Sequence, residues 1–138
     1  NILVTDDHRC CLADFGLTLV STHSQTWSMT TSSATTKGSM RWLAPEYISL
    51  TESLSNHTSR DVYAFGCTIV EIITQKPPFH ELKNDASVLL GLISGARPAR
   101  PNNVWCPDEI WDLAVSCWAQ DTQNRPSADG IYHILTNL

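Results

Sequence analysis

The chain opens on two short apolar runs, residues 2–4 and 9–13, which the polar segment 5–8 separates. A polar turn between two short apolar runs is typical of a β-hairpin. Residues 17–41 follow with neither the alternation of a strand nor the spacing of a helix, and thirteen of these twenty-five residues are Ser or Thr. We therefore expect one hairpin and then a long exposed loop.

A long apolar helix is predicted after this region. Residues 58–61 read Thr-Ser-Arg-Asp, the form of a capping box, and the apolar stretch that follows reaches about Thr74 before Pro77 and Pro78 stop it. Nearly every face of this stretch is apolar. We therefore expect it to be a central helix with protein on all sides.

Shorter helices are predicted from their start and stop signals. Pro45 can open a short helix, Asn84 can cap one that Gly95 ends, Pro107 can open another, and Ser127 can cap the last. The predicted fold is therefore mainly α with a small β-hairpin.

Composition limits the classes of protein that remain. A chain of 138 residues is one domain's worth, and its formal net charge is -5 with nine scattered Lys and Arg residues, which argues against a nucleic-acid or anionic-membrane partner. The chain has five cysteines, an odd number, and none of them forms the C-x-x-C pairs that are typical of zinc sites. This pattern favours buried thiols in a reducing compartment. The longest apolar stretch is too short to span a bilayer. We expect a soluble, intracellular, cytoplasmic protein.

Asp14-Phe15-Gly16 directly follows the predicted hairpin, and alone it is equally typical of a turn. Other motifs follow it in a fixed order. They are Gly38-Ser39-Met40-Arg41-Trp42-Leu43-Ala44-Pro45-Glu46, Asp61-Val62-Tyr63-Ala64-Phe65-Gly66 and Arg125-Pro126. With Asn1 ahead of them, these motifs resemble the C-terminal lobe of a eukaryotic protein kinase over essentially the whole chain. Trp42, Trp118 and the Arg125-Pro126 ending resemble the tyrosine-kinase-like group of serine/threonine kinases.

The resemblance implies a partial protein kinase catalytic domain over residues 1–138, from the end of the catalytic loop to the last helix, with the N-terminal lobe absent. It implies ATP and Mg²⁺ as cofactors, with Asn1 and Asp14 as the metal ligands. Oxygen ligands suit a hard cation, and the hairpin would bring these two positions together.

The resemblance also makes the hydroxyl-rich loop the activation segment. Phe15 would pack beneath the other lobe, although simple core packing is an open alternative, and Gly16 would permit a backbone flip. Thr35 and Thr36 are the candidate phosphorylation sites, because an added phosphate can order such a loop, although the loop can also stay unmodified. Ser39 matches a position that favours serine/threonine over tyrosine substrates.

Three residues have structural roles by the same resemblance. Glu46 and Arg125 are expected to form a buried ion pair between the end of the activation segment and the last helices. Asp61 would accept amide hydrogen bonds from the catalytic loop, a role compatible with simple helix capping.

Four kinase parts are absent from these residues: a glycine-rich loop, a strand lysine, a helix glutamate and the catalytic aspartate, which the family pattern places upstream of Asn1. We therefore expect the chain alone to be inactive. Two alternatives stay open. The chain is a fragment of a serine/threonine kinase whose intact parent transfers the ATP γ-phosphoryl group to a protein substrate, or it is a truncated binding module that acts through its helical surface.

Overall fold

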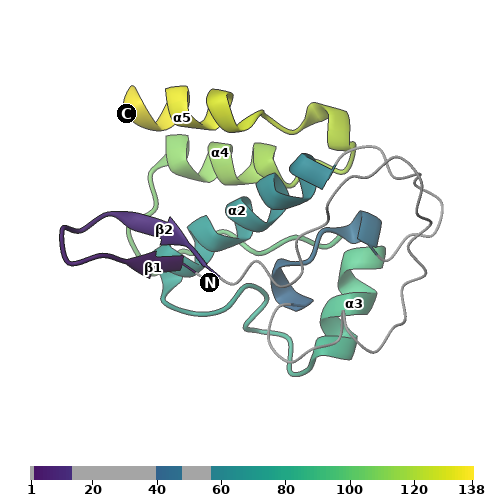
Figure 1. Ribbon diagram of the computed structural model, residues 1–138. Helices are drawn as coiled ribbons and strands as arrows, with labels where there is room; N and C mark the ends of the chain where they lie inside the picture. The colour runs from purple at the N-terminus through teal and green to yellow at the C-terminus, as the bar shows by residue number, and fades with distance from the viewer. Residues whose placement is uncertain (1, 14–39, 48–56) are drawn as a thin grey trace.

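A computed structural model describes residues 2–13, 40–47 and 57–138 of the chain. In chain order its elements are β1 (Ile2–Val4), β2 (Cys10–Leu12), the 3-10 helices η2 (Met40–Trp42) and η3 (Pro45–Tyr47), α2 (His57–Thr74), α3 (Asp85–Ile93), α4 (Asp108–Cys117), the 3-10 helix η4 (Thr122–Asn124) and α5 (Ala128–Thr136). The described residues are mainly helical with a two-stranded sheet, which confirms the predicted fold class (Figure 1).

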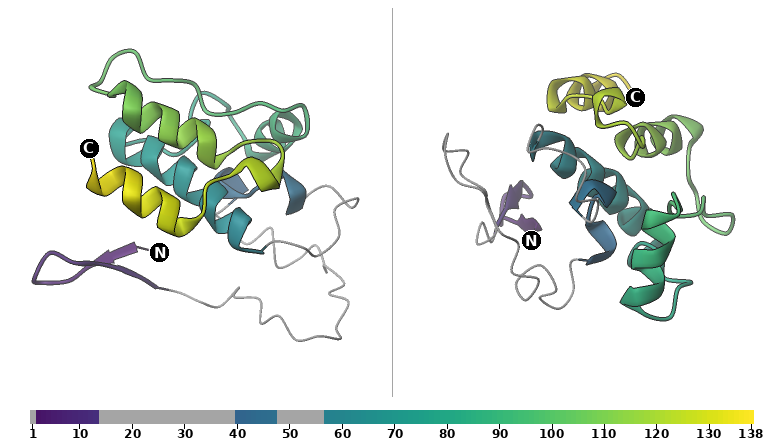
Figure 2. Two further views of the ribbon diagram at one scale, coloured as in Figure 1. Left: turned by 90° about the horizontal axis from the view of Figure 1, so that it is seen from above. Right: turned by 90° about the vertical axis from the view of Figure 1, so that its right-hand side faces the viewer.

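The two strands form the predicted antiparallel hairpin. Ile2 pairs with Leu12 at the open end, and Val4 pairs with Cys10 next to the turn. His8 adopts a left-handed backbone conformation with φ 62° in that turn. The hairpin lies to one side of the helices, and all six strand residues are exposed (Figure 2).

Helix α2 lies at the centre of the helical part. It packs along α4, and it also contacts η2 and η4. Helices α4 and α5 lie on one side of α2, and α3 lies on another (Figures 1 and 2). At Gly66 an added Cβ would meet the Cβ of Cys117 at 2.8 Å and the carbonyl oxygen of Ala114 at 3.0 Å. The absence of a side chain at Gly66 therefore sets how closely α2 and α4 approach.

The core is formed mainly by side chains of α2, α3 and α4 that exclude water together. Its buried apolar residues are Ala44, Val62, Tyr63, Cys67, Ile69, Val70, Phe79, Val88, Leu92, Leu113, Ala114, Cys117, Trp118 and Ile131. Burial of this apolar surface provides most of the stability of such a fold.

The predicted signals at four helix ends are confirmed. The side chains of Asn84 and Ser127 each accept a hydrogen bond from a backbone N–H three residues later, at 2.9 Å and 3.1 Å. Gly95 follows α3 with φ 83°, a conformation that glycine adopts without strain. Pro107 directly precedes α4. These ends depend on local chemistry, which is why the sequence alone identifies them.

Two expectations for the long helix are wrong. It includes His57, so Thr58 lies inside the helix and does not occupy the capping position before it. It is also not covered on every face, because Asp61 and Ile72 are exposed and fall on the same helical stripe.

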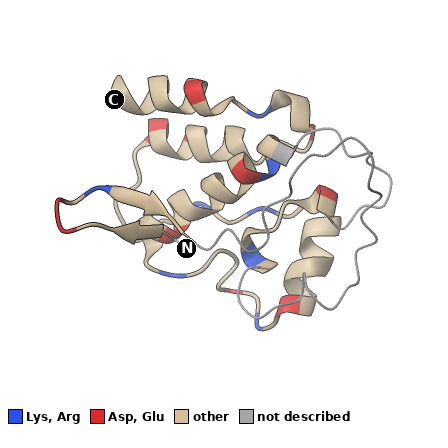
Figure 3. Cartoon of the chain, in the orientation of Figure 1, with Lys and Arg blue, Asp and Glu red and all other residues tan. Residues whose placement is uncertain are grey.

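The basic side chains are dispersed over the described residues. Lys and Arg lie on the hairpin, on the connections and on helices rather than on one face (Figure 3). The described surface therefore has no concentrated basic patch.

Candidate functional site

Residues 40–47, here called the anchored segment, lie against the helical core directly after the hydroxyl-rich stretch. This segment contains η2 and η3, and η2 contacts both α2 and α3. It is held by three polar side chains of its own, at positions 41, 42 and 46.

Glu46 and Arg125 form a bidentate ion pair. Nη1 and Nη2 of Arg125 donate to Oε1 and Oε2 of Glu46 at 2.6 Å and 2.9 Å, and the side chains of Arg125 and Glu46 are only 0% and 6% exposed. The guanidinium also donates to the carbonyls of Ala119 and Ser59, each at 3.0 Å, and lies 5.2 Å from the centre of the Tyr63 ring. The pair therefore ties the anchored segment to α2 and to the chain that follows α4.

Trp42 and Glu71 form a second link between the anchored segment and α2. The indole Nε1 of Trp42 donates to Oε2 of Glu71 at 3.1 Å. A half-buried carboxylate on a largely apolar helix needs such a donor, since burial without a partner is costly.

Arg41 forms a third link, to the connection between α2 and α3. Its Nη1 donates to the carbonyls of Pro78 and Phe79 at 3.1 Å and 2.6 Å, and its Nη2 donates to the carbonyl of Leu82 at 3.1 Å. Its Nε lies 3.5 Å from Oδ1 of Asp85 at the start of α3. One side chain thus fixes η2 against a turn and a helix.

A shallow hollow of about 170 Å³ lies between the anchored segment and α2. Its lining includes Trp42, Tyr47, Arg60 and Asp61. The guanidinium of Arg60 lies 4.2 Å from the centre of the Tyr47 ring, and Asp61 is exposed at the edge. The hollow therefore offers a carboxylate next to aromatic surface.

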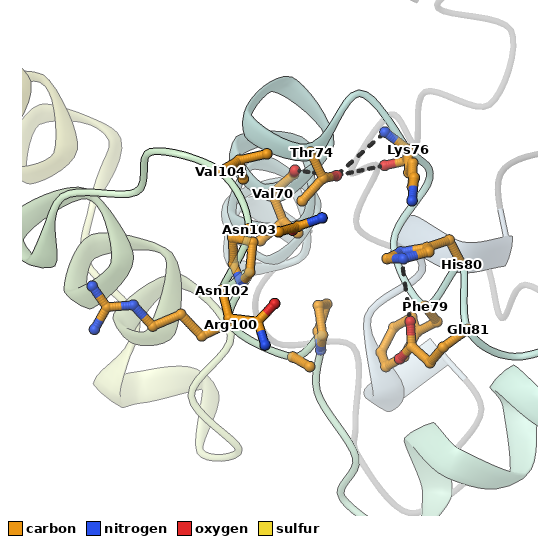
Figure 4. A pocket seen from close by; sticks show the side chains of 13 residues that line it. Val70, Thr74, Lys76, Phe79, His80, Glu81, Arg100, Asn102, Asn103 and Val104 are labelled. Carbon is orange, nitrogen blue, oxygen red and sulfur yellow. Dashed lines mark hydrogen bonds and ion pairs between the residues drawn. The ribbon is translucent and has the colours of Figure 1, made fainter.

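A larger groove of about 370 Å³ lies between residues 76–81 and 98–104, with α2 as its floor (Figure 4). Lys76 and His80 line one wall, and Asn102 and Asn103 line the other. His80 is within 3.6 Å of Glu81, an ion pair only when the imidazole is protonated. The groove is open, and its lining combines polar with apolar side chains.

The buried thiols of the core are poor nucleophiles. Burial raises the pKa of Cys67 to about 12 and the pKa of Cys117 to about 11, and it also raises the pKa of Tyr63. These groups therefore stay protonated at neutral pH, which argues against thiolate chemistry at these two positions.

The sequence-predicted site residues divide into two sets. Glu46, Asp61 and Arg125 are described, and the structure brings Glu46 and Arg125 together while Asp61 lies across the hollow on α2. The others lie outside the described residues: Asn1, Asp14, Phe15, Gly16, Thr35, Thr36 and Ser39. In the described ranges there is no group of three or more His, Cys, Asp or Glu side chains that could hold a metal ion.

The sequence reasoning missed the contacts of Arg41 and of Trp42. The Trp42 contact could have been anticipated from Glu71, because a charged residue within an apolar helix requires a polar partner. The acceptors of Arg41 are mostly backbone carbonyls, which have no sequence signature.

No helix in the described part of the chain combines the length and apolar character needed to cross a membrane.

The sequence is similar to protein kinases over nearly its whole length. The model of the family described as protein tyrosine and serine/threonine kinase matches residues 1–135. The dual specificity protein kinase pyk3 of Dictyostelium discoideum is 36% identical over 138 residues, which cover 100% of this chain and 9% of that protein.

Two further relatives are also kinases by name, and one of the two names states tyrosine as the substrate class. The tyrosine-protein kinase transforming protein ros of UR2 avian sarcoma virus is 44% identical over 100 residues, 72% of this chain and 23% of that protein. The light-sensor protein kinase of Ceratodon purpureus is 37% identical over 133 residues, 84% of this chain and 9% of that protein. The chain thus spans less than a quarter of the length of each of these relatives.

Proposed function

Since the chain belongs to the protein tyrosine and serine/threonine kinase family, we propose that residues 1–138 are the C-terminal lobe of a kinase catalytic domain, from the end of the catalytic loop to the last helix. The intact protein would transfer the γ-phosphoryl group of ATP to a hydroxyl group of a protein substrate. The observation that carries this proposal is the anchored segment, which the Glu46–Arg125 pair holds against the helical core directly after the hydroxyl-rich stretch.

Asn1 and Asp14 are the proposed ligands of Mg²⁺. The hairpin register supports them, because Ile2 pairs with Leu12 and these two residues are one and two positions away from Asn1 and Asp14 in the sequence. An amide and a carboxylate oxygen also suit a hard cation. When bound with ATP, Mg²⁺ neutralises charge on the phosphates.

Asp61 is proposed to hold the catalytic loop from α2. Its exposure at the edge of the hollow leaves its carboxylate accessible to backbone amides of an incoming segment. We place the general base in that loop, upstream of Asn1, so that residues 1–138 alone supply no catalytic acid or base.

The stretch between Asp14 and the anchored segment is proposed as the activation segment, with Phe15 and Gly16 at its start and Thr35 and Thr36 as phosphorylation sites. Ser39 supports serine/threonine substrates. The names of the relatives support tyrosine or dual specificity equally well, so tyrosine transfer is the second candidate. A requirement for ATP and a protein substrate fits an intracellular, cytoplasmic location, without a nucleic-acid or membrane partner.

A binding module is the alternative from another class. Its support is exposed apolar surface on α3, where Leu90 and Ile93 both face solvent. In that case the chain would bind a protein partner through its helices without phosphoryl transfer.

The test is phosphoryl transfer by the full-length protein that carries this chain, with Mg-ATP and matched peptides that contain Ser, Thr or Tyr. We expect transfer to Ser and Thr peptides, and a loss of about 100-fold or more in Asp14→Asn. Asp129→Asn, on the exposed start of α5, is the matched control and should keep full activity. Transfer only to Tyr would select the second candidate, and binding of a partner without any transfer would select the module.

A further inference from the structure

The turn that accepts the side chain of Arg41 has an unusual backbone. Phe79 has φ 55°, in the left-handed region that aromatic residues rarely adopt, and its side chain is only 2% exposed. Its carbonyl accepts both the backbone N–H of Leu82 at 2.9 Å and Nη1 of Arg41 at 2.6 Å. Such a conformation persists only where surrounding contacts hold it.

Arg41 is suited to hold this turn because a guanidinium presents several N–H donors in a rigid plane. It satisfies the carbonyls of Pro78, Phe79 and Leu82 together, with its side chain only 17% exposed. A lysine at this position has a single nitrogen and could not reach all three acceptors in the same geometry. The contact therefore depends on arginine rather than on positive charge alone.

The same side chain fixes the end of the proposed activation segment. Ser39 is two residues before Arg41, so at most about 7 Å of extended chain separates their Cα atoms. The neighbouring Trp42 is bonded to Glu71 of α2, so the chain after Ser39 is held at two adjacent residues. Movement at the turn would therefore be transmitted to Arg41 and Trp42, the residues through which the described chain continues from Ser39.

We propose that Arg41 is a positioning residue for phosphoryl transfer: through its contacts with the turn at residues 78–82 it fixes the chain that follows Ser39, and with it the place of the substrate hydroxyl. This inference rests on the proposed function. In this role Arg41 would act on the substrate indirectly, by holding the segment that is proposed to position it.

Two variants and one control test this role in the full-length protein. Arg41→Gln removes the charge and most donors, and Arg41→Lys keeps the charge with one nitrogen. Arg100→Gln is the control, since Arg100 also bonds a backbone carbonyl, that of Cys106, and a carboxylate, that of Asp108, but is 43% exposed and lies outside the anchored segment.

The first readout is amide hydrogen exchange at Leu82, which does not depend on activity. We expect Arg41→Gln to speed this exchange by about 10-fold, the equivalent of one lost hydrogen bond, and Arg100→Gln to leave it unchanged. Unchanged exchange in Arg41→Gln would overturn the proposal whatever the kinetics show.

The second readout separates positioning from general stability. We expect Arg41→Gln to raise KM for the peptide by about 10-fold while KM for ATP stays within about twofold, with partial recovery in Arg41→Lys. A lower kcat with both KM values unchanged would indicate loss of folded enzyme only and would overturn the positioning role. Absence of transfer in the wild-type protein would instead remove the proposed function, and the positioning role with it, even if the exchange result held.

Discussion

Glu46 and Arg125 are 79 residues apart in the sequence, yet both oxygens of the carboxylate are held by both terminal nitrogens of the guanidinium in a site closed to water. The remaining Nε donor of Arg125 is bonded to a backbone carbonyl. Each charge therefore depends on the other, because neither has water to replace its partner.

Removal of one partner should therefore be costly. We expect Arg125→Gln to lower the free energy of unfolding by about 3–5 kcal/mol, because Glu46 would stay buried without compensation. Urea denaturation of the 138-residue chain measures this change. The paired replacement Glu46→Leu with Arg125→Met should cost less than the single variant. Arg100→Gln, at an exposed ion pair, should change little. If Arg125→Gln and Arg100→Gln lowered the free energy of unfolding equally, burial would not be what makes the Glu46–Arg125 pair important.

The close approach of α2 to α4 predicts intolerance at Gly66. Gly66→Ala should lower the free energy of unfolding by about 1–3 kcal/mol, because the new methyl group would overlap the Cβ of Cys117 and force the helices apart. Gly130→Ala in α5 is the control, since its nearest neighbours would be 3.4 Å away or more and alanine favours helix. Thermal melts of both variants measure these changes in stability. An unchanged melting temperature in Gly66→Ala would show that α2 and α4 can move apart without loss of stability.

Burial divides the cysteines into reactive and protected thiols. In the folded chain, Cys10 and Cys11 on the exposed strand β2 should react quickly with a thiol reagent, and Cys106 more slowly. Cys67 and Cys117 should react only after denaturation, because they are buried and their raised pKa values leave little thiolate. Mass spectrometry after timed labelling reads each position. Fast labelling of Cys67 under native conditions would indicate that α2 opens readily.

The same thiols predict loss of stability in alkali. The pKa of Cys67 rises on folding from 9.0 to about 12, so above pH 9.0 the unfolded chain releases this proton while the folded chain keeps it. Stability is therefore complete below pH 9.0 and falls as the pH rises toward 12, by about 1.4 kcal/mol per pH unit for this group. Cys67→Ala should be less stable at pH 8 but should lose stability less steeply between pH 9 and 11. If the free energy of unfolding fell equally steeply with pH in the wild-type chain and in Cys67→Ala, Cys67 would not be the source of this pH dependence.

The exposed apolar side chains of the hairpin should make the isolated chain prone to self-association. Ile2, Leu3, Val4 and Leu12 are all at least half exposed, which is unusual for adjacent apolar residues. We expect the 138-residue chain to bind the dye ANS and to associate as its concentration rises. Leu3→Lys with Leu12→Lys should reduce both effects. If the chain stays a monodisperse monomer and binds no dye, the exposed hairpin surface does not cause self-association.

Local signals predicted most of the secondary structure. Asn84 and Ser127 cap their helices by hydrogen bonds that span three residues, so the sequence contains both partners. The start of α2 was misplaced by the same kind of reasoning, because the residues 58–61 satisfy a capping pattern that the helix does not use. Local chemistry permits a cap but does not require one.

Long-range contacts were less accessible from the sequence. The Glu46–Arg125 contact was expected only from resemblance to the family, since nothing in the intervening residues reveals it. The Arg41 contacts were not expected at all, because a left-handed Phe79 and three converging carbonyls exist only once α2 and α3 are in place. The proposed metal and activation-segment residues lie outside the described ranges and stay predictions.

The indole rings of Trp111 and Trp118 give the molecule an optical reporter. They meet edge to face with centroids 5.7 Å apart, and Trp118 also lies next to Gly66 at the approach of α2 to α4. Coupled transitions of such a pair contribute to near-ultraviolet circular dichroism only while both rings are held at a fixed angle. That spectral band would report, without any added label, whether the end of α4 that packs next to Gly66 stays ordered, while the fluorescence of exposed Trp105 would respond to solvent.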